Sequence, residues 1–584
     1  MSRRMFTRSR TIIALALLLP VLPLMLGAES PAPLQAPAAR TGAVAVEEGI
    51  PVLSADVKQA CGSCHVPDEK GIMTRISYRR ATPENWELTI KRMMALNGAP
   101  VTPEQARVVL KYLADNQGLA PEEARPIMFD ADHTQIDTFT YAANADTNNL
   151  CSKCHSMGRV MSERRTPTEW GLLISMHRGV YPGIDGGSGG FRRGGAAGAA
   201  APAGGRAAAA SRQPMDLAVD HLKGAFPLMT PEWTSWAASK RPVRMAGKWA
   251  LSGAEPGKGP VMGDVTIAEV PGAADTFTTT TTFTYVRTGE TVTRTGRGLV
   301  YTGFQWRGRS SEKAQGTPTW REVTFVERDQ NEMSGRWFTG DYAERGMTVT
   351  LRRVGKDTLV AGTDLPSLKS GVAGQTVRIY GANLPLKLLP ADVTFGEGLT
   401  VTKVTASTPG MATVVVDVAP GARVGPRDVV VAGAVRPAAI VVYDHIDGIK
   451  VLPRAGLARL GGIVFPKQYQ QFEAIAFHNG LDGKPNTADD LDLGPVMPTW
   501  KLEEYAATFK EDDIEFVGEL SSTGYFTPNV DGPNVQRSGE RNNVGDVWVI
   551  ADYTPPGGTP LRGRAHLLVT VPLYMNWSST EAGR

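Results

Sequence analysis

The chain has 584 residues, of which 42% are hydrophobic and 21% charged, and its formal net charge is +3. At roughly 150 residues per domain this length predicts about three or four domains, and the composition excludes a largely disordered protein. So small a net charge gives no electrostatic basis for a nucleic-acid partner.

The N-terminus is typical of an export signal. Arginines at positions 3, 4, 8 and 10 precede an apolar run over residues 11–26 and small residues at 27–28. The run is short for a bilayer span and no later run matches it, so we predict a cleaved signal peptide over residues 1–28 and no stable membrane span. Ser2–Phe6 also resembles a twin-arginine signal, but covalent haem is normally attached after export of an unfolded chain, which favours a Sec signal. Residues 29–50, rich in Pro and Ala, are predicted to be a linker.

All four cysteines lie in two Cys-x-x-Cys-His motifs. In this motif the two thiols attach a c-type haem through thioethers, and the adjacent His binds the iron. A zinc site or a redox dithiol would not require the His in both motifs. We therefore predict two covalent haem c groups, attached through Cys61, Cys64, Cys151 and Cys154 and bound through His65 and His155.

The sequence after each motif repeats. Thr82-Pro83 aligns with Thr166-Pro167 without a gap. The alignment pairs Arg80 with Arg164, Trp86 with Trp170, and Met93 with His177. Met and His are the usual sixth ligands of c-type haem iron. We therefore predict His65/Met93 for the first haem and His155/His177 for the second, with Met94 and the less supported Met176 as competing ligands.

Other repeated positions receive weaker predictions. An arginine fork matches a carboxylate, so Arg80 and Arg164 are predicted to pair with haem propionates, the alternative being solvated arginines at helix starts. Trp86 and Trp170 are predicted to be core aromatics. Residues 109–113 align with 218–222 as a closing helix of each half, so His221 is predicted to be a packing residue, with a haem ligand as the alternative. His133 has no repeat partner and is predicted to be structural or exposed.

The domain order follows from a change of periodicity. Residues 51–240, with a helix over 102–116, are predicted to form a helical diheme cytochrome domain, which contains a low-complexity insert over 183–212. Period-2 alternation then predicts three antiparallel β domains: a barrel over 241–356, an Ig-like sandwich over 357–442 and a C-terminal sandwich over 443–584. The expected strands include 265–270, 276–286, 299–306 and 512–517, with a turn at 295–298. The fold class is therefore multidomain, α plus all-β.

One acidic loop, residues 479–492, has clustered carboxylates but lacks the EF-hand spacing. We interpret it as an Asx/Gly turn between strands, with a Ca²⁺ site as the alternative.

This order of features resembles the alpha subunit of quinohemoprotein amine dehydrogenase over nearly the whole mature chain. The resemblance rests on the two haem motifs with their Thr-Pro-x-x-Trp repeat and on four later segments. These segments are Gly247–Gly253, Pro256–Pro260, Thr499–Glu504 and Gly545–Trp548.

The resemblance implies a periplasmic oxidoreductase of three different subunits. A small partner would carry a cysteine tryptophylquinone that oxidises a primary amine to an aldehyde and ammonia, and a β-propeller subunit would complete the assembly. This chain would hold no catalytic residue. It would pass electrons through one His/Met and one bis-His haem to a periplasmic copper protein or cytochrome c. The alternatives are a free-standing diheme carrier, the cytochrome subunit of another dehydrogenase, or a scaffold.

Overall fold

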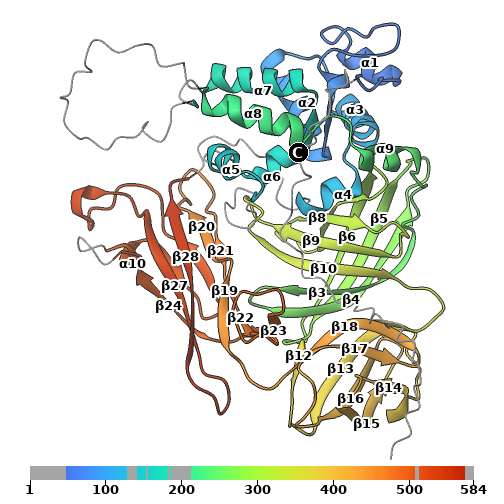
Figure 1. The fold of residues 1–584 in the computed structure, drawn as a ribbon, viewed down its shortest axis with the longest axis vertical. Helices are drawn as coiled ribbons and strands as arrows, with labels where there is room; N and C mark the ends of the chain where they lie inside the picture. Colours follow the sequence, from blue (N-terminus) through green and yellow to red (C-terminus); the bar gives the residue numbers. More distant parts are fainter. Residues whose placement is uncertain are drawn as a thin grey trace, which may run out of the picture. The chain divides into compact units, whose positions relative to one another are not determined.

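The computed structural model describes residues 48–127, 141–152, 155–181, 184–185, 212–506 and 512–572. The predicted signal peptide, most of the linker and of the 183–212 insert, His133 and Cys154 lie outside the described residues. No helix in these ranges is long and apolar enough to cross a membrane. Helices form the N-terminal region and β-sheets form the remainder (Figure 1), so the predicted combination of helical and β domains is confirmed at this level.

The helical region consists of two lobes with a similar order of elements. The first lobe contains α1 (Ala55–Cys61), β1 (Arg79–Ala81), α2 (Pro83–Asn97), α3 (Pro103–Asn116) and α4 (Pro121–Ala124). The second contains α5 (Ala145–Cys151), α6 (Met157–Met161), β2 (Glu163–Arg165), α7 (Pro167–Val180), α8 (Pro214–Ala225) and α9 (Pro231–Ala238). The repeat in the sequence is therefore a repeat in the structure.

Thr-Pro pairs determine where the long helices begin. Thr82 and Thr166 cap α2 and α7, and each side-chain oxygen accepts a hydrogen bond from the backbone N–H three residues on. Thr102 caps α3 in the same way and forms a capping box with Gln105. A threonine cap satisfies a free amide and a proline in the first turn has none to satisfy, so the pair fixes the helix start.

A two-stranded antiparallel ribbon joins the lobes. β1 pairs with β2 so that Arg79 lies opposite Arg165 and Arg80 lies opposite Arg164. Because Arg80 and Arg164 are equivalent in the repeat, the ribbon brings equivalent positions of the two lobes together.

The repeated tryptophans are buried in different cores. The Trp86 indole donates a hydrogen bond to the Gln117 carbonyl (3.0 Å), and the Trp170 indole donates one to the Phe226 carbonyl (3.0 Å). Trp86 belongs to a core confined mainly to the first lobe, whereas the core around Trp170 continues into the β-barrel. Both indoles are therefore structural, as predicted for core aromatics.

Eight antiparallel strands close into the predicted barrel, in the order β10-β3-β4-β5-β6-β7-β8-β9. Their bounds are β3 (Gly247–Glu255), β4 (Gly259–Glu269), β5 (Thr276–Tyr285), β6 (Thr291–Tyr301), β7 (Gln305–Ser311), β8 (Trp320–Val326), β9 (Glu332–Thr339) and β10 (Arg345–Arg353). Inward positions carry large apolar side chains such as Trp249, Phe283 and Trp337, which fill the interior.

Two local predictions in the barrel are wrong. The strand expected over 299–306 is broken at Thr302-Gly303, where both residues have positive φ, 57° and 82°. The turn expected at 295–298 lies inside β6. Its Gly298 is required by packing, because a Cβ there would lie 2.0 Å from the Trp306 ring.

The next β unit has two four-stranded sheets around one apolar core. One sheet contains β11 (Leu359–Thr363), β13 (Gln375–Ala382), β16 (Met411–Val418) and β15 (Leu399–Ser407). The other contains β12 (Ser367–Lys369), β18 (Ala434–Tyr443), β17 (Gly425–Val431) and β14 (Val393–Thr394).

The C-terminal unit has three small sheets around another core. They contain β19 (Gly448–Leu452), β22 (Glu473–His478) and β23 (Leu491–Val496); β20 (Ala455–Arg459), β28 (Leu561–Thr570), β27 (Gly545–Tyr553) and β24 (Thr499–Glu504); and β21 (Gln470–Gln471), β26 (Tyr525–Pro528) and β25 (Gly518–Leu520). The strand expected over 512–517 is a short helix, α10 (Asp513–Phe516). Short apolar runs do not distinguish strand from helix, which explains the error.

Candidate haem-binding sites

The first cysteine of each motif ends a short helix. α1 ends at Cys61 and α5 at Cys151, and their N-termini are capped by Ser54 and Asn144. The Cys61 carbonyl accepts hydrogen bonds from the N–H groups of Cys64 (3.3 Å) and His65 (2.9 Å). The motif therefore folds into a turn directly after the helix, in which the two thiols and the imidazole are held on a short stretch of backbone.

All three predicted histidine ligands share one hydrogen-bonding pattern. Nδ1 faces a backbone carbonyl oxygen in each: His65 faces Thr74 (2.8 Å), His155 faces Ser156 (3.0 Å) and His177 faces Leu173 (2.8 Å). A carbonyl oxygen only accepts, so Nδ1 carries the proton and Nε2 keeps a lone pair. This is the arrangement of a metal-binding histidine whose other ring nitrogen is fixed by the protein, and these residues fit haem iron.

The second lobe favours a neutral imidazole. Burial lowers the pKa of His155, and the charges of Arg159 and His177 also lower it, against the effect of the hydrogen bond to Ser156. Only the neutral form of imidazole can bind a metal through Nε2.

Met93 and His177 occupy equivalent helical positions. Each lies eleven residues after its capping threonine, Thr82 or Thr166, on α2 and α7. Met93 Sδ is 3.7 Å from the Asn97 side-chain nitrogen, a weak contact that leaves the thioether available. Met94 is as half-buried as Met93, so burial does not separate these two candidates, and both stay open.

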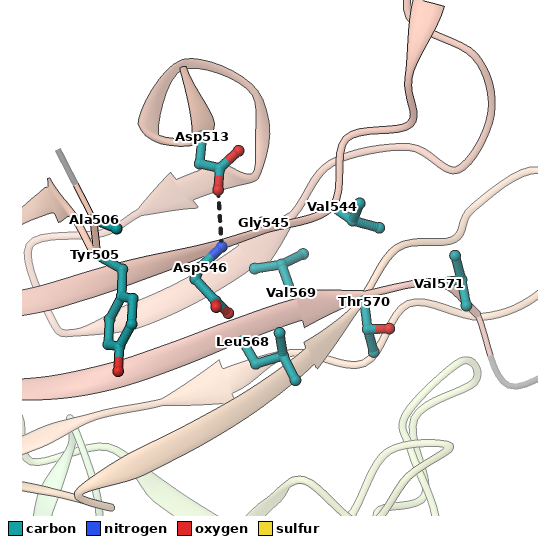
Figure 2. Close-up of a pocket in the computed structure, with 10 residues that line it drawn as sticks. All are labelled: Tyr505, Ala506, Asp513, Val544, Gly545, Asp546, Leu568, Val569, Thr570 and Val571. Carbon is teal, nitrogen blue, oxygen red and sulfur yellow. Dashed lines mark hydrogen bonds between the residues drawn. The ribbon is translucent and has the colours of Figure 1, made fainter. Parts of the chain in front are cut away.

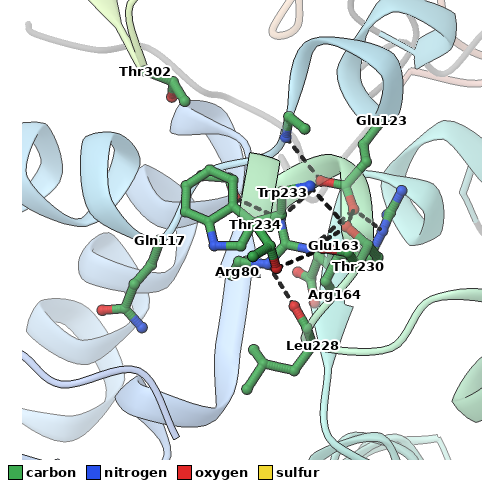
Figure 3. A network of polar contacts seen from close by, with 12 residues as sticks. Arg80, Gln117, Glu123, Glu163, Arg164, Leu228, Thr230, Trp233, Thr234 and Thr302 are labelled. Atoms are coloured by element: carbon green, nitrogen blue, oxygen red, sulfur yellow. Dashed lines mark hydrogen bonds and ion pairs between the residues drawn. The ribbon is translucent and has the colours of Figure 1, made fainter. Parts of the chain in front are cut away.

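Arg80 has a different environment from the one expected (Figure 3). It is completely buried and all five of its N–H groups have protein partners. Nη1 and Nη2 bind the two oxygens of Glu123 (2.8 and 2.9 Å). The remaining donors bind Gly118 and Leu228 carbonyls and the Thr230 hydroxyl. Arg80 therefore has no donor left for a haem propionate, and the structure gives it a role in the core.

Arg164 binds the same carboxylate. Its Nε donates to Glu123 Oε1 (3.1 Å) and its Nη1 donates to the Met161 carbonyl (2.6 Å). Arg80 and Arg164 therefore each bind a carboxylate, but it is the side chain of Glu123 and not the haem propionate that was predicted. Neither arginine is a solvated residue at a helix start, the alternative considered from the sequence.

Sequence reasoning missed Glu123. Burial raises the pKa of this carboxyl, but the charges of Arg164 and Arg80 and the hydrogen bonds it accepts outweigh burial and bring the pKa to about 2. A signal was present: Pro121-Glu122 and Pro231-Glu232 open α4 and α9, the last helices of the two lobes. Extending the repeat to these helices aligns Glu123 with Trp233, whose ring packs on Arg80 at 4.7 Å.

A second ion cluster flanks the ribbon. Glu163 binds both Arg79 and Arg165 at 2.6 Å. Burial lowers the pKa of Arg79 to about 9, whereas the charges of Arg165 and Arg79 outweigh burial and lower the pKa of Glu163 to about 2. The two clusters together make the lobe interface strongly ionic as well as buried.

The closing helices of both lobes contact the segment that precedes the haem-motif helix. The Tyr112 hydroxyl on α3 accepts a hydrogen bond from the Leu53 N–H (2.7 Å). His221, at the equivalent position on α8, has Nε2 2.6 Å from the Tyr141 hydroxyl. This contact matches the packing role predicted for His221.

Carboxylates of the acidic loop over residues 479–492 accept hydrogen bonds from backbone N–H groups of the same loop. Asp489 Oδ2 accepts from the N–H groups of Leu481 (2.6 Å) and Asp482 (3.1 Å), and Asp490 Oδ2 accepts from Asn486 N–H (2.8 Å). Asp482 Oδ1 also accepts from the Lys484 N–H two residues on (2.7 Å), which is the geometry of an Asx turn, as predicted for residues 479–492.

The C-terminal unit contains a pocket of about 430 Å³ beside β27 and β28 (Figure 2). Its walls are mainly apolar, from Val544, Leu568 and Val569. Asp513 in its lining accepts a hydrogen bond from the Asp546 N–H (3.0 Å) and pairs with Arg537. The pocket contains none of the predicted haem residues.

Helical lobes with haem-motif geometry, followed by several β domains, define a haem-binding multidomain protein. Family models of the quinohemoprotein amine dehydrogenase alpha subunit match four segments. These are the haem-binding domain (residues 54–193), domain II (242–354), domain III (356–444) and domain IV (449–581). The chain belongs to this family of alpha subunits, the haem subunits of an oxidoreductase. The resemblance seen in the sequence is thereby confirmed.

Other comparisons add little. No curated protein matches the chain. Among solved structures, a redesigned β-barrel matches with 13% identity and a TM-score of 0.18, covering 20% of this chain and all of that one. A Bacteroides ovatus glucan-utilisation protein, SGBP-B, matches with 10% identity and a TM-score of 0.18, covering 56% of this chain and 65% of that one. These TM-scores carry no argument about function.

Proposed function

We propose that this chain is the electron-transfer subunit of a periplasmic amine dehydrogenase complex. Electrons enter from a cysteine tryptophylquinone on a small partner subunit during oxidation of a primary amine. They leave for a periplasmic copper protein or cytochrome c. A β-propeller subunit completes the complex. The support for this assignment is the match of all four domains to one family of alpha subunits.

The observation that supports the haem assignment is that Nδ1 of all three histidines lies within hydrogen-bonding distance of a backbone carbonyl oxygen. Nδ1 of each is held by a backbone carbonyl, so Nε2 is free to bind iron. Covalent haem c would supply a one-electron Fe(III)/Fe(II) couple at each site. His65 with Met93 would hold the first group and His155 with His177 the second, while the four motif cysteines would attach them. A thioether ligand favours Fe(II) and a second imidazole disfavours it, so the two sites are expected to have different potentials.

The function is tested by purifying the complex from its native host and staining the separated subunits for haem and for quinone. We expect a haem-positive band of this chain, a small quinone-positive band, and reduction of the haem when a primary amine is added. A haem-positive chain with no quinone partner and no response to amines would instead identify a free-standing diheme carrier.

The ligand assignment of the first haem is tested by replacing its predicted sixth ligand, Met93, with the residue type found at the equivalent position of the second lobe. Met93→His is expected to lower one haem potential by on the order of 0.1 V or more and to abolish the weak red absorption band of a ferric Met-ligated haem. Met94→Leu is the matched control and should leave both the potential and the band unchanged. If Met94→Leu abolishes the band and Met93→His does not, Met94 is the ligand.

A further inference from the structure

The interior of the β-barrel contains a buried arginine without a hydrogen-bond partner. Arg294 on β6 is 1% exposed, and its Nε, Nη1 and Nη2 atoms all lack a partner among the described residues. A guanidinium does not lose its proton in proteins. A buried charge without compensation is strongly destabilising, so an interior arginine of this kind requires an acceptor.

Aromatic rings surround Arg294 but do not use its donors. The guanidinium carbon is 4.5 Å from the Trp320 ring centre, 4.9 Å from Phe283 and 5.1 Å from Trp337. Such contacts stabilise a cation through the ring faces. The N–H bonds lie in the guanidinium plane and need acceptors there, as in a bidentate pair with a carboxylate.

An interior carboxylate, Glu322, already has other hydrogen-bond donors. Glu322 on β8 accepts hydrogen bonds from the Ser310 hydroxyl (2.7 Å) and the Trp306 indole (3.1 Å), and it makes none with Arg294. It influences Arg294 only through space. Glu322 therefore does not fill the donor positions of the guanidinium.

Other unsatisfied polar groups lie in the same interior. Thr281 is directly opposite Arg294 in the β5–β6 ladder, and its hydroxyl has no partner in the described part of the chain. The Trp337 indole N–H also has none, although its ring packs on Arg294. The hydroxyls of Thr279 and Thr324, on the inward faces of β5 and β8, are likewise buried without a hydrogen-bond partner among the described residues. Buried polar groups are nearly always satisfied, so this concentration indicates a bound species.

We propose that the barrel interior binds one small monovalent anion, held by the Arg294 guanidinium with the Trp337 indole N–H and the Thr281 hydroxyl. Each of these three groups can donate, and a small anion can accept from all of them while placing a counter-charge in direct contact with the guanidinium. The species is small because the Trp320, Phe283 and Trp337 rings pack around the guanidinium, with ring centres 4.5–5.1 Å from its carbon. A halide and a one- or two-carbon carboxylate share this chemistry. The site does not depend on the haem assignments.

The experiment uses crystals of the full haem-loaded chain grown in bromide, together with thermal unfolding at constant ionic strength while chloride or formate replaces a bulky anion. We expect an anomalous bromide peak within hydrogen-bonding distance of Arg294. We also expect a melting temperature that rises saturably with one of the two small anions, which identifies the source. Thr281→Val keeps the side-chain volume and should weaken this response by roughly tenfold.

Arg294→Met should remove the peak and the response, and Arg297→Met is the matched control, because Arg297 lies on the outward face of the same strand. If Arg294→Met fails to fold, Thr281→Val decides. Water alone beside Arg294, or a response unchanged in Thr281→Val, would overturn the proposal. A bromide peak without any stabilisation in solution would mark an adventitious ion only and would also overturn it.

Discussion

The two lobes of the helical region share their local structure but differ in what surrounds them. Both have a helix ending in a haem motif, a strand of the joining ribbon, a Thr-Pro helix with the predicted sixth ligand, and a closing helix. The first lobe has its own apolar core, whereas the core of the second continues into the barrel. The repeat therefore places the predicted ligands at equivalent positions, and the differing contacts determine how each lobe is stabilised.

The largest loss of stability is expected when Glu123, the carboxylate that binds arginines of both lobes, is replaced. Glu123→Gln leaves the buried Arg80 and Arg164 without their counter-charge, and we expect a loss of roughly 3–5 kcal/mol in unfolding free energy. Denaturant unfolding of the haem-loaded protein, followed through haem absorption, measures it. Glu122→Gln is the control in the same turn, where the side chain is exposed. A loss below about 1 kcal/mol for Glu123→Gln would show that the lobes do not depend on this contact.

Acid should weaken the lobe interface. The folded-state pKa values of Glu123 and Glu163 are about 2, below the usual value of a glutamate. Their stabilising effect is therefore complete above about pH 4.5 and is lost as pH falls toward 2, by on the order of 3 kcal/mol each. Unfolding free energies measured between pH 6 and 3 should fall, and the fall should be smaller in Glu123→Gln. An identical pH slope in this variant would contradict the assignment.

Substitutions of Trp86 and Trp170 should distinguish the core of the first lobe from the core that the second lobe shares with the barrel. Trp86→Phe and Trp170→Phe each remove a buried indole hydrogen bond and leave a small cavity, at a cost of roughly 2–3 kcal/mol. Only Trp170→Phe should speed amide hydrogen exchange in the barrel, because only its core extends there. Faster exchange in the barrel of Trp86→Phe would show that both lobes are coupled to it.

The smallest effect is expected at the closing helix. Tyr112→Phe removes the hydroxyl that accepts the Leu53 N–H, which is partly exposed, and should cost about 1 kcal/mol or less. A thermal shift of the haem-loaded protein measures it. His221→Phe removes the equivalent contact with Tyr141 in the second lobe, and a much larger effect there would mark His221 as more than a packing residue.

The sequence predicted those features of the structure that depend on short motifs or on a regular alternation of apolar residues. The haem motifs, the helix over 102–116 and the alternation of the barrel strands are local signals, and the structure contains all three elements. The environment of Arg80 was not predictable in this way, because its partners Gly118, Glu123 and Leu228 are brought together only by packing of the lobes. Gly298 was misread as a turn signal, because a glycine required by an aromatic ring on the neighbouring strand, here Trp306 on β7, looks the same in sequence as a glycine in a turn.

The antiparallel pairing of β1 with β2 relates the lobes by a local two-fold axis, and Arg80 and Arg164 meet across it. A carboxylate that binds both arginines must lie near that axis, where one such group fits. The repeats therefore cannot both supply it, and the position equivalent to Glu123 is occupied by Trp233. Two identical copies of one lobe could not build this interface. Only a tandem chain, in which each half can diverge, combines an asymmetric centre with unlike residues at the Met93 and His177 positions.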